Sequence, residues 1–250
     1  MCKAIDVINQ IEQFAPLELQ EGYDNSGLQI GNKNTIVTGI YIALNIDLNV
    51  IDDAINKGCN FILVHHPLIF NPIKQIDTST YYAKVIKKVL LNDLVVYAGH
   101  TSVDNAEYSI AYTNLQKLGC SNIHRVDEVF IADIESTISD VVNNLSIITK
   151  DHNILSTKDK SIKRLAYING SGGRMDEILQ VLIENNVDLY ISSEFKYSFL
   201  LELTNNNIAV IELNHFNSEQ VFIEIMKNKL CTSFDNVVAS TICQNPYSKE

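Results

Sequence analysis

Hydrophobic and polar residues follow two different periods along the chain, and segments of the two kinds alternate. Residues 3–15 place Ile5, Ile8, Ile11 and Phe14 on one face of a helix that ends at Pro16. Short apolar or β-branched segments predict strands at 36–44, 59–64, 94–98, 164–168, 187–191 and 208–213. Segments of helical period lie between most of them, at 49–57, 80–92, 107–118, 174–185 and 195–204.

This alternation predicts the α/β class, with mostly parallel sheets flanked by helices. We expect an N-terminal α/β domain over residues 1–127 and a second α/β domain over 128–250. The polar stretch 149–163 predicts a loop or hairpin early in the second half. A helix at 217–230 and a strand near 234–240 close the chain, and the segment from about 215 could pack back on the first domain.

Composition and charge narrow the choice of location and partners. The 250 residues contain 19 basic and 30 acidic side chains, so the net charge is 19 − 30 = −11, which speaks against a nucleic-acid binder. The five cysteines are scattered without a C-x-x-C pair, as expected for free thiols in a reducing compartment. No apolar run reaches the roughly 18 residues of a membrane span. We therefore expect a cytoplasmic protein without membrane partners.

Three predicted strands end in side chains that bind metals. His65 and His66 follow the strand at 59–64 directly, and Pro67 favours extended backbone at His66. Neighbouring residues of a strand point to opposite faces, so both histidines reach one ligand only if the chain leaves the strand there. The alternative is one histidine in the core and one in a loop.

The other two strand ends carry one histidine and one carboxylate each. His100 and Asp104 follow one strand, and His215 and Glu219 follow another. His215 and Glu219 are four residues apart and share a face if a helix starts near residue 214. Each residue also has a structural alternative, because Asp104 suits a cap or turn and Glu219 suits the first turn of a helix.

The three strand ends together indicate a metal site, because ligands of open α/β sheets bind outside the carboxyl ends of the strands. The candidates exceed the three protein ligands of a mononuclear catalytic zinc site. Two divalent ions that share a bridging carboxylate would use them all. Imidazole and carboxylate donors without thiolate suit Zn, Fe, Mn, Co or Ni and leave the choice among these open. The predicted metal ligands are His65, His66, Asp104, His215 and Glu219.

At these motifs the chain resembles the Nif-three-like dinuclear-metal proteins, whose bacterial members are often labelled GTP cyclohydrolase 1 type 2 homologues. The matching segments, in the family's order, are Asp24–Gly31, His65–Leu68, His100–Asp104, Gly170–Gly173 and His215–Glu219. The resemblance implies that the same five residues bind two metal ions. It also implies two related α/β domains with the site between them, and a ring-shaped homohexamer.

Several positions depart from the pattern of this family. Tyr23 stands where relatives usually have Trp, Asn45 where Asp is common, and Asn214 where Gly usually precedes the histidine. The segment 105–109 lacks the usual paired glycines, and 192–198 lacks a histidine that relatives often carry. The expected ligands are all present, so these departures concern substrate handling and acid–base chemistry.

Three further features have a functional and a structural explanation. The run Gly170–Arg174 follows a strand and precedes a helix, so it could bind a substrate phosphate or simply form a tight turn. Asp24 and Asn25 could orient the ligands, or belong to a turn. His100, four residues before a predicted ligand, is the candidate catalytic residue for proton transfer, or else supports the ligands.

The function predicted from these features is a metal-dependent hydrolase. Two ions would activate a water molecule, and the resemblance implies a GTP-cyclohydrolase type of reaction on a nucleotide substrate. The alternative is a non-enzymatic scaffold that binds metal or a partner protein.

Overall fold

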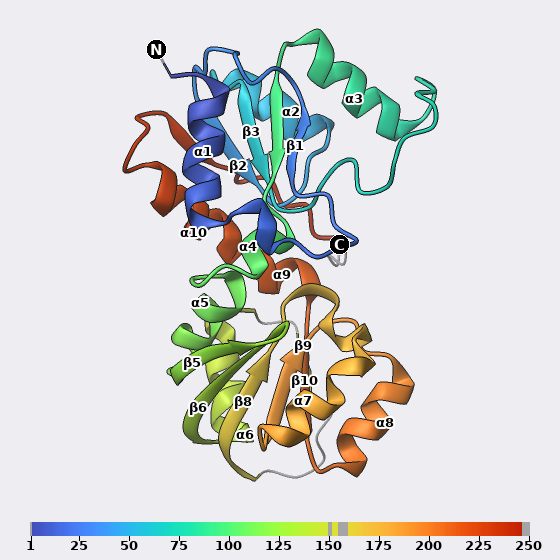
Figure 1. Cartoon of the computed structure of the whole chain (residues 1–250), viewed down its shortest axis with the longest axis vertical. Helices are drawn as coiled ribbons and strands as arrows, with labels where there is room; N and C mark the ends of the chain where they lie inside the picture. Colours follow the sequence, from blue (N-terminus) through green and yellow to red (C-terminus); the bar gives the residue numbers. More distant parts are fainter. Residues whose placement is uncertain (1, 150–151, 155–159, 247–250) are drawn as a thin grey trace. The chain divides into compact units, whose positions relative to one another are not determined.

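The computed structural model describes residues 2–149, 152–154 and 160–246. The chain divides into two compact units (Figure 1). The first contains residues 1–106 and 222–250, and the second contains residues 107–221. Each unit is built on one sheet, and helices pack against that sheet.

The first unit has a five-stranded sheet in the order β1-β4-β3-β2-β11. β1 is antiparallel to β4, whereas the other three pairings are parallel. The strands are β1 (Gly27–Ile30), β2 (Ile40–Ala43), β3 (Phe61–Val64), β4 (Val95–Ala98) and β11 (Val237–Ala239). The helices are α1 (Ala4–Phe14), α2 (Leu48–Asn56), α3 (Tyr81–Leu91), α4 (Thr101–Asp104) and α10 (Val221–Leu230).

The central strands of this sheet are buried on both faces, as their continuous apolar sequences predict. Every residue of β2, β3 and β4 is buried. α2 and α3 contribute residues such as Val50 and Val85 to the core on one face. On the other face the Tyr97 hydroxyl donates to the Glu12 carboxylate of α1 at 3.0 Å. The carboxyl ends of β3 and β4 therefore emerge side by side from a rigid core.

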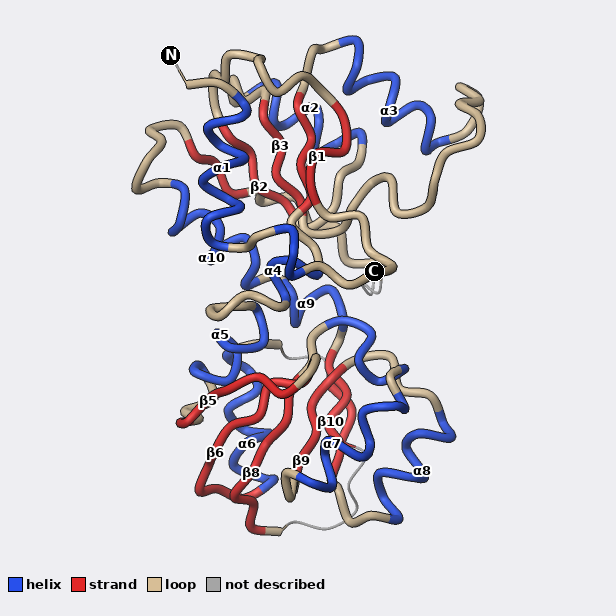
Figure 2. The backbone as a smooth tube through the Cα atoms, in the orientation of Figure 1, coloured by secondary structure: helices blue, strands red, loops and turns tan. Residues whose placement is uncertain are grey.

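The second unit has a six-stranded sheet in the order β5-β6-β8-β9-β10-β7. Figure 2 labels β5, β6, β8, β9 and β10 of this sheet. Its strands are β5 (Ser121–Val126), β6 (Val129–Thr137), β7 (His152–Ile154), β8 (Ser161–Tyr167), β9 (Leu189–Ser192) and β10 (Ala209–Leu213). Its helices are α5 (Ile110–Lys117), α6 (Ile138–Asn144), α7 (Leu179–Glu184), α8 (Tyr197–Asn205) and α9 (His215–Glu219). Successive residues of β8 enter different cores, with Leu165 in one and Ala166 in the other, so both faces are covered.

The α/β class with two helix-flanked sheets is confirmed, although the second sheet is less parallel than the pattern indicates. Its β5-β6, β6-β8 and β7-β10 pairings are antiparallel, against two parallel pairings. The segment 149–163 is not a hairpin, because β7 pairs with β10 and β8 pairs with β6 and β9. Residues 150–151 and 155–159 lie outside the described residues.

The compact units also differ from the expected domain limits. The expected boundary at 127/128 falls in the turn between β5 and β6, whose pairing keeps both strands in one unit. At the other end, β11 pairs with β2, so the C-terminal segment belongs to the first sheet. Within the described part of the chain, every helix is too short or too polar to span a lipid bilayer.

Candidate metal centre

The predicted ligands of the first unit lie at the carboxyl ends of β3 and β4. These strands are parallel neighbours, so the residues after them meet at one edge of the sheet. The backbone N–H groups of His65 and His66 both donate to the Leu44 carbonyl, each at 3.1 Å. The chain thus leaves the strand at this point, which is the condition for both histidines to reach one site.

His100 lies close to both His65 and His66. Each of the three residues offers a ligand atom, and these atoms lie within 4.8 Å of one another. The ring centroids of His65 and His66 are 4.7 Å apart, and His65 lies 5.1 Å from His100. An Asp104 carboxylate oxygen lies 3.8 Å from Nε2 of the fully buried His65. The first unit therefore gathers three imidazoles that could hold a metal ion, and the Asp104 carboxylate lies beside one of them.

Each of these imidazoles has its Nδ1 next to an oxygen acceptor. His65 Nδ1 lies 3.0 Å from the Gly99 carbonyl, and His66 Nδ1 lies 2.8 Å from the Asn45 side-chain oxygen. Metal-binding histidines commonly donate their second ring N–H in this way, which fixes the tautomer and the ring orientation. A donating Nδ1 leaves the lone pair on Nε2, the nitrogen available to a metal.

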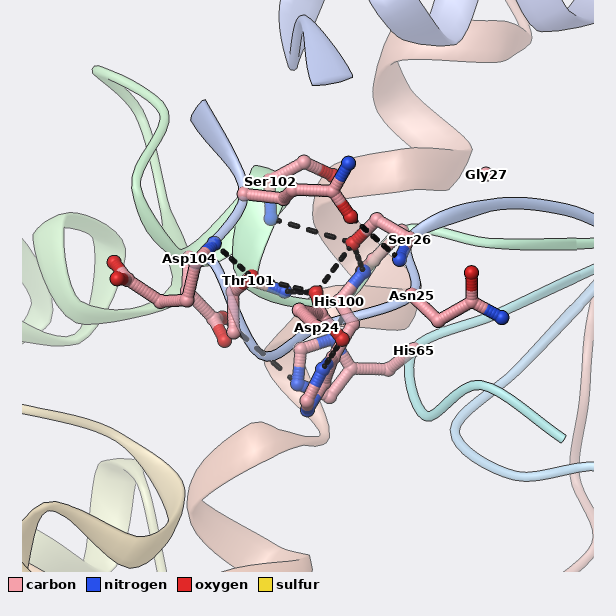
Figure 3. Close-up of polar contacts among 12 residues, drawn as sticks. Asp24, Asn25, Ser26, Gly27, His65, His100, Thr101, Ser102 and Asp104 are labelled. Atoms are coloured by element: carbon pink, nitrogen blue, oxygen red, sulfur yellow. Dashed lines mark hydrogen bonds and ion pairs between the residues drawn. The ribbon is translucent and has the colours of Figure 1, made fainter. Parts of the chain in front are cut away.

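Asp24 anchors His100 in the same manner, and its side chain is fully buried (Figure 3). One carboxylate oxygen lies 2.7 Å from His100 Nδ1, and the other accepts from the Ser26 hydroxyl and from the Thr101 hydroxyl and backbone N–H. Burial alone would raise the pKa of Asp24, but the hydrogen bonds and charge of His100, with both hydroxyls, hold that pKa well below its usual range. Asp24 is therefore a buried anion that orients His100.

The predicted ligands of the second unit form a pair on α9, which begins directly after β10. His215 Nε2 lies 3.2 Å from a carboxylate oxygen of Glu219, a residue that is 2% exposed. His215 Nδ1 lies 2.6 Å from Glu194. Burial alone would lower the pKa of His215, but the hydrogen bonds and charges of Glu219 and Glu194 outweigh it and raise that pKa to about 9.

The glycine-rich run forms a short 3-10 turn, Gly170–Arg174, and its glycines are needed for packing. A Cβ on Gly170 would lie 2.8 Å from Glu219 Oε1 and 3.3 Å from His215 Nε2. A Cβ on Gly173 would lie 2.5 Å from the Ser193 carbonyl. The tight-turn explanation therefore accounts for the glycines, and Gly170 has the additional role of admitting the ligand pair beside the backbone.

Two residues that contact the predicted ligands were not predicted from the sequence, Asn45 and Glu194. Asn45 was noted only as a departure from the family pattern, yet it holds Nδ1 of His66. Glu194, which has a left-handed φ of 57°, holds Nδ1 of His215 and also pairs with Arg174 at 2.8 Å. Both residues lie just past the carboxyl end of a strand, β2 and β9 respectively, and that position is the signal that could have identified them.

Known proteins match this chain over almost its full length. A family model described as Duf34/NIF3 (NGG1p interacting factor 3) matches residues 2–246. The chain belongs to the Duf34/NIF3 family. This confirms the resemblance that the strand-end motifs indicated.

Curated relatives of this Duf34/NIF3 chain carry one recurring name, "GTP cyclohydrolase 1 type 2 homolog". The relative from Clostridium acetobutylicum is 31% identical, covering 91% of this chain and 89% of its own length. The relative from Campylobacter jejuni is 30% identical and covers 98% of each chain.

Solved structures show the same fold. A hypothetical protein of Staphylococcus aureus, SA1388, matches with a TM-score of 0.90 and 24% identity, covering 99% of each chain. Reduced HcgD from Methanocaldococcus jannaschii matches with a TM-score of 0.85 and 24% identity, covering 96% of this chain and 98% of its own.

Proposed function

We propose that this chain binds two divalent metal ions and uses them to hydrolyse a nucleotide in a reaction of the GTP-cyclohydrolase type. The ligands would be His65, His66, Asp104, His215 and Glu219. One observation carries the metal part of the proposal: each of the three histidines in this set has its Nδ1 within 3.0 Å of an oxygen acceptor. That arrangement is typical of histidines that bind a metal through Nε2.

The chemistry of the donors fits such ions. Nitrogen and carboxylate oxygen donors without thiolate suit Zn, Fe, Mn, Co or Ni. His65 and Glu219 are buried, and a metal ion would balance the charge of the buried Glu219 carboxylate.

Bound ions would supply an activated water and polarise the group that it attacks. The chain's own residues would orient the donors. Asn45 holds His66, while Glu194 holds His215 through one oxygen and the exposed Arg174 guanidinium through the other. The positive charge of Arg174 therefore lies beside Glu194, which in turn contacts the proposed ligand His215. At this position Arg174 could contact a triphosphate.

The names of relatives support the reaction class. The relative from Helicobacter pylori, which is 27% identical and covers 96% of each chain, is named "GTP cyclohydrolase 1 type 2". Transferred to this chain, that name implies that water attacks the imidazole ring carbon of guanine.

Turnover of GTP by metal-loaded protein tests the proposal. We expect turnover by the wild type, loss of turnover in His65→Ala, and normal turnover in His124→Ala, since His124 is an exposed residue of β5. Metal content measured on the same samples separates the metal-binding part of the proposal from the hydrolysis part. Bound metal with equal background rates in wild type and His65→Ala would contradict the hydrolase and support the scaffold alternative.

The assembly and location expected from the sequence stay predictions. Light scattering of the purified protein would check the ring-shaped homohexamer. Fractionation of cells would check the cytoplasmic location.

A further inference from the structure

The first unit has a pocket of about 660 Å³, lined by residues of the segment 68–75 and by Tyr82. These residues belong to the loop between β3 and α3 and to the first turn of α3 (Figure 1). The volume is within the range of roughly 300–1,000 Å³ that is typical of small-molecule sites. The lining that the structure describes contains none of the five predicted metal ligands, so the pocket is a separate place for a ligand.

Two aromatic rings, Phe70 and Tyr82, lie in the wall of this pocket. Phe70 is 42% exposed and Tyr82 is 37% exposed, so a ligand can cover part of each ring. Leu68, Pro72 and Ile73 add apolar atoms to the same wall. Exposed aromatic side chains bind the flat faces of nucleobases by stacking. The apolar part of the lining therefore suits a planar ring.

The polar part of the lining consists of Asn71, Lys74 and Gln75. Within the described part of the chain, none of these three side chains makes a hydrogen bond or an ion pair, so all three are available to a ligand. Lys74 can only donate, and the ligand edge that faces it must therefore carry acceptors. Guanine has two adjacent acceptors, O6 and N7, whereas adenine has an amino donor beside N7.

We propose that this pocket binds the guanine base of a nucleotide, with O6 and N7 of the base facing Lys74. The ring would stack on Phe70 and Tyr82. Asn71 and Gln75, whose amides both donate and accept, would bind the remaining edge of the base. This inference rests on the proposed hydrolysis of a nucleotide, and it adds the residues that recognise the base.

The position of Phe70 relates the pocket to the proposed metal centre. The ring centroids of Phe70 and His100 are 6.2 Å apart, with an angle of 84° between the rings, and His100 lies 5.1 Å from His65. All of these residues belong to the first unit. A base that stacks on Phe70 would therefore be held close to the predicted metal ligands of this unit.

The segments on the two sides of the pocket are held by hydrogen bonds. The Ile69 N–H donates to the Gln29 side-chain oxygen at 3.0 Å, and the Ile69 carbonyl accepts from the Asn25 amide. On the other side, the Thr80 hydroxyl caps α3 by accepting from the Ala83 N–H at 3.3 Å. A pocket whose walls are already ordered loses less conformational entropy when a ligand binds.

Calorimetric titration of the full chain after treatment with a chelator tests the pocket separately from the metal centre. The probes are guanosine monophosphate, adenosine monophosphate and ribose 5-phosphate. We expect saturable binding of guanosine monophosphate, about tenfold weaker binding of adenosine monophosphate, and no saturable binding of ribose 5-phosphate. Equal affinities for the two nucleotides would overturn the proposal, and so would ribose 5-phosphate that binds as tightly as guanosine monophosphate.

Variants of the lining identify the binding site. Phe70→Ala should weaken binding of guanosine monophosphate about 5- to 100-fold through lost stacking, whereas Phe70→Tyr should bind like wild type. Lys74→Met should remove the preference over adenosine monophosphate. The controls, Tyr197→Ala and Lys84→Met, change exposed residues outside the pocket lining and should keep wild-type affinity and preference. Unchanged affinity in Phe70→Ala would overturn the proposal.

Turnover of GTP by metal-loaded protein separates this inference from the proposed function. We expect Phe70→Ala to raise KM for GTP while its metal content stays that of wild type. Nucleotide binding that depends on Phe70, in protein without GTP turnover, would support the pocket and contradict the hydrolase. GTP turnover with the same KM in wild type and Phe70→Ala would support the hydrolase and overturn the pocket.

Discussion

The two units differ in the oxygens that lie beside the Nδ1 atoms of their predicted ligand histidines. In the first unit His65 and His66 donate to uncharged oxygens, a backbone carbonyl and an amide. In the second unit His215 lies between two carboxylates, which raise its pKa to about 9. Both carboxylates therefore favour the protonated form of His215. The histidines of the two units thus differ in the acceptor beside Nδ1, which is uncharged for His65 and His66 and a carboxylate for His215.

The largest expected effect comes from removing the carboxylate of the second unit. Glu219→Gln should weaken metal binding by more than about 100-fold and reduce the number of bound ions, because a ligand affects affinity more than its supporting residues do. Elemental analysis and titration with Zn²⁺ measure both quantities. Glu184→Gln, at an exposed position of α7, is the control. If Glu219→Gln kept two ions per chain, the second unit would not contribute to the centre.

A methyl group beside the ligand pair should have the next largest effect. Gly170→Ala places its Cβ against Glu219 and His215, at a φ of 61° that favours glycine. Gly58→Ala is a matched control, with a φ of 70° and no atom within 4 Å of its Cβ. We expect a loss of about 1 kcal/mol in the free energy of unfolding for Gly58→Ala from backbone strain alone. Gly170→Ala should lose more and should also weaken metal binding.

Urea unfolding and metal titration of both glycine variants check this expectation. Equal stability losses and wild-type metal affinity in both would mean that Gly170 serves the turn only. The close approach of Gly170 to the ligands would then have no functional consequence.

The charged setting of His215 predicts how the stability of metal-free protein depends on pH. A pKa raised in the folded state stabilises the protein fully below the unfolded value of about 6.5, and this contribution is lost as the pH rises through about 9. The loss is on the order of 1–3 kcal/mol. Urea unfolding of chelator-treated protein between pH 6 and 9.5 measures it. Glu194→Gln should flatten the profile; an unchanged profile would show that Glu194 does not hold the proton on His215.

The smallest expected effect comes from exchanging the two kinds of acceptor. Asn45→Asp would give His66 a charged partner and should raise its pKa, while Glu194→Gln should lower the pKa of His215. We expect changes in metal affinity of about tenfold, since both residues act on ligands from outside. NMR titration of the histidines in metal-free protein tests the exchange. If the pKa of neither His66 nor His215 changed, the acceptors beside Nδ1 would not set the charge of these histidines.

Local sequence was sufficient for the central strands of the first sheet and insufficient for β5. β2, β3 and β4 are fully buried, so their apolar runs are unambiguous. β5 has exposed or half-buried residues throughout, and it was predicted neither as a strand nor as antiparallel. Half-exposed strands lack a continuous apolar signal, and their pairing is decided by contacts far along the chain.

The sequence by itself determined the α/β class and the strand ends that carry histidine and carboxylate side chains, because both depend on residues close together in the chain. Only the tertiary structure decided which nitrogen of each histidine is available. The acceptors of His66, His100 and His215 lie 21, 76 and 21 residues away from them. Hydrogen bonds over such separations leave no periodic pattern in the sequence, so Asn45, Asp24 and Glu194 acquire these roles only when folding places them beside the imidazoles.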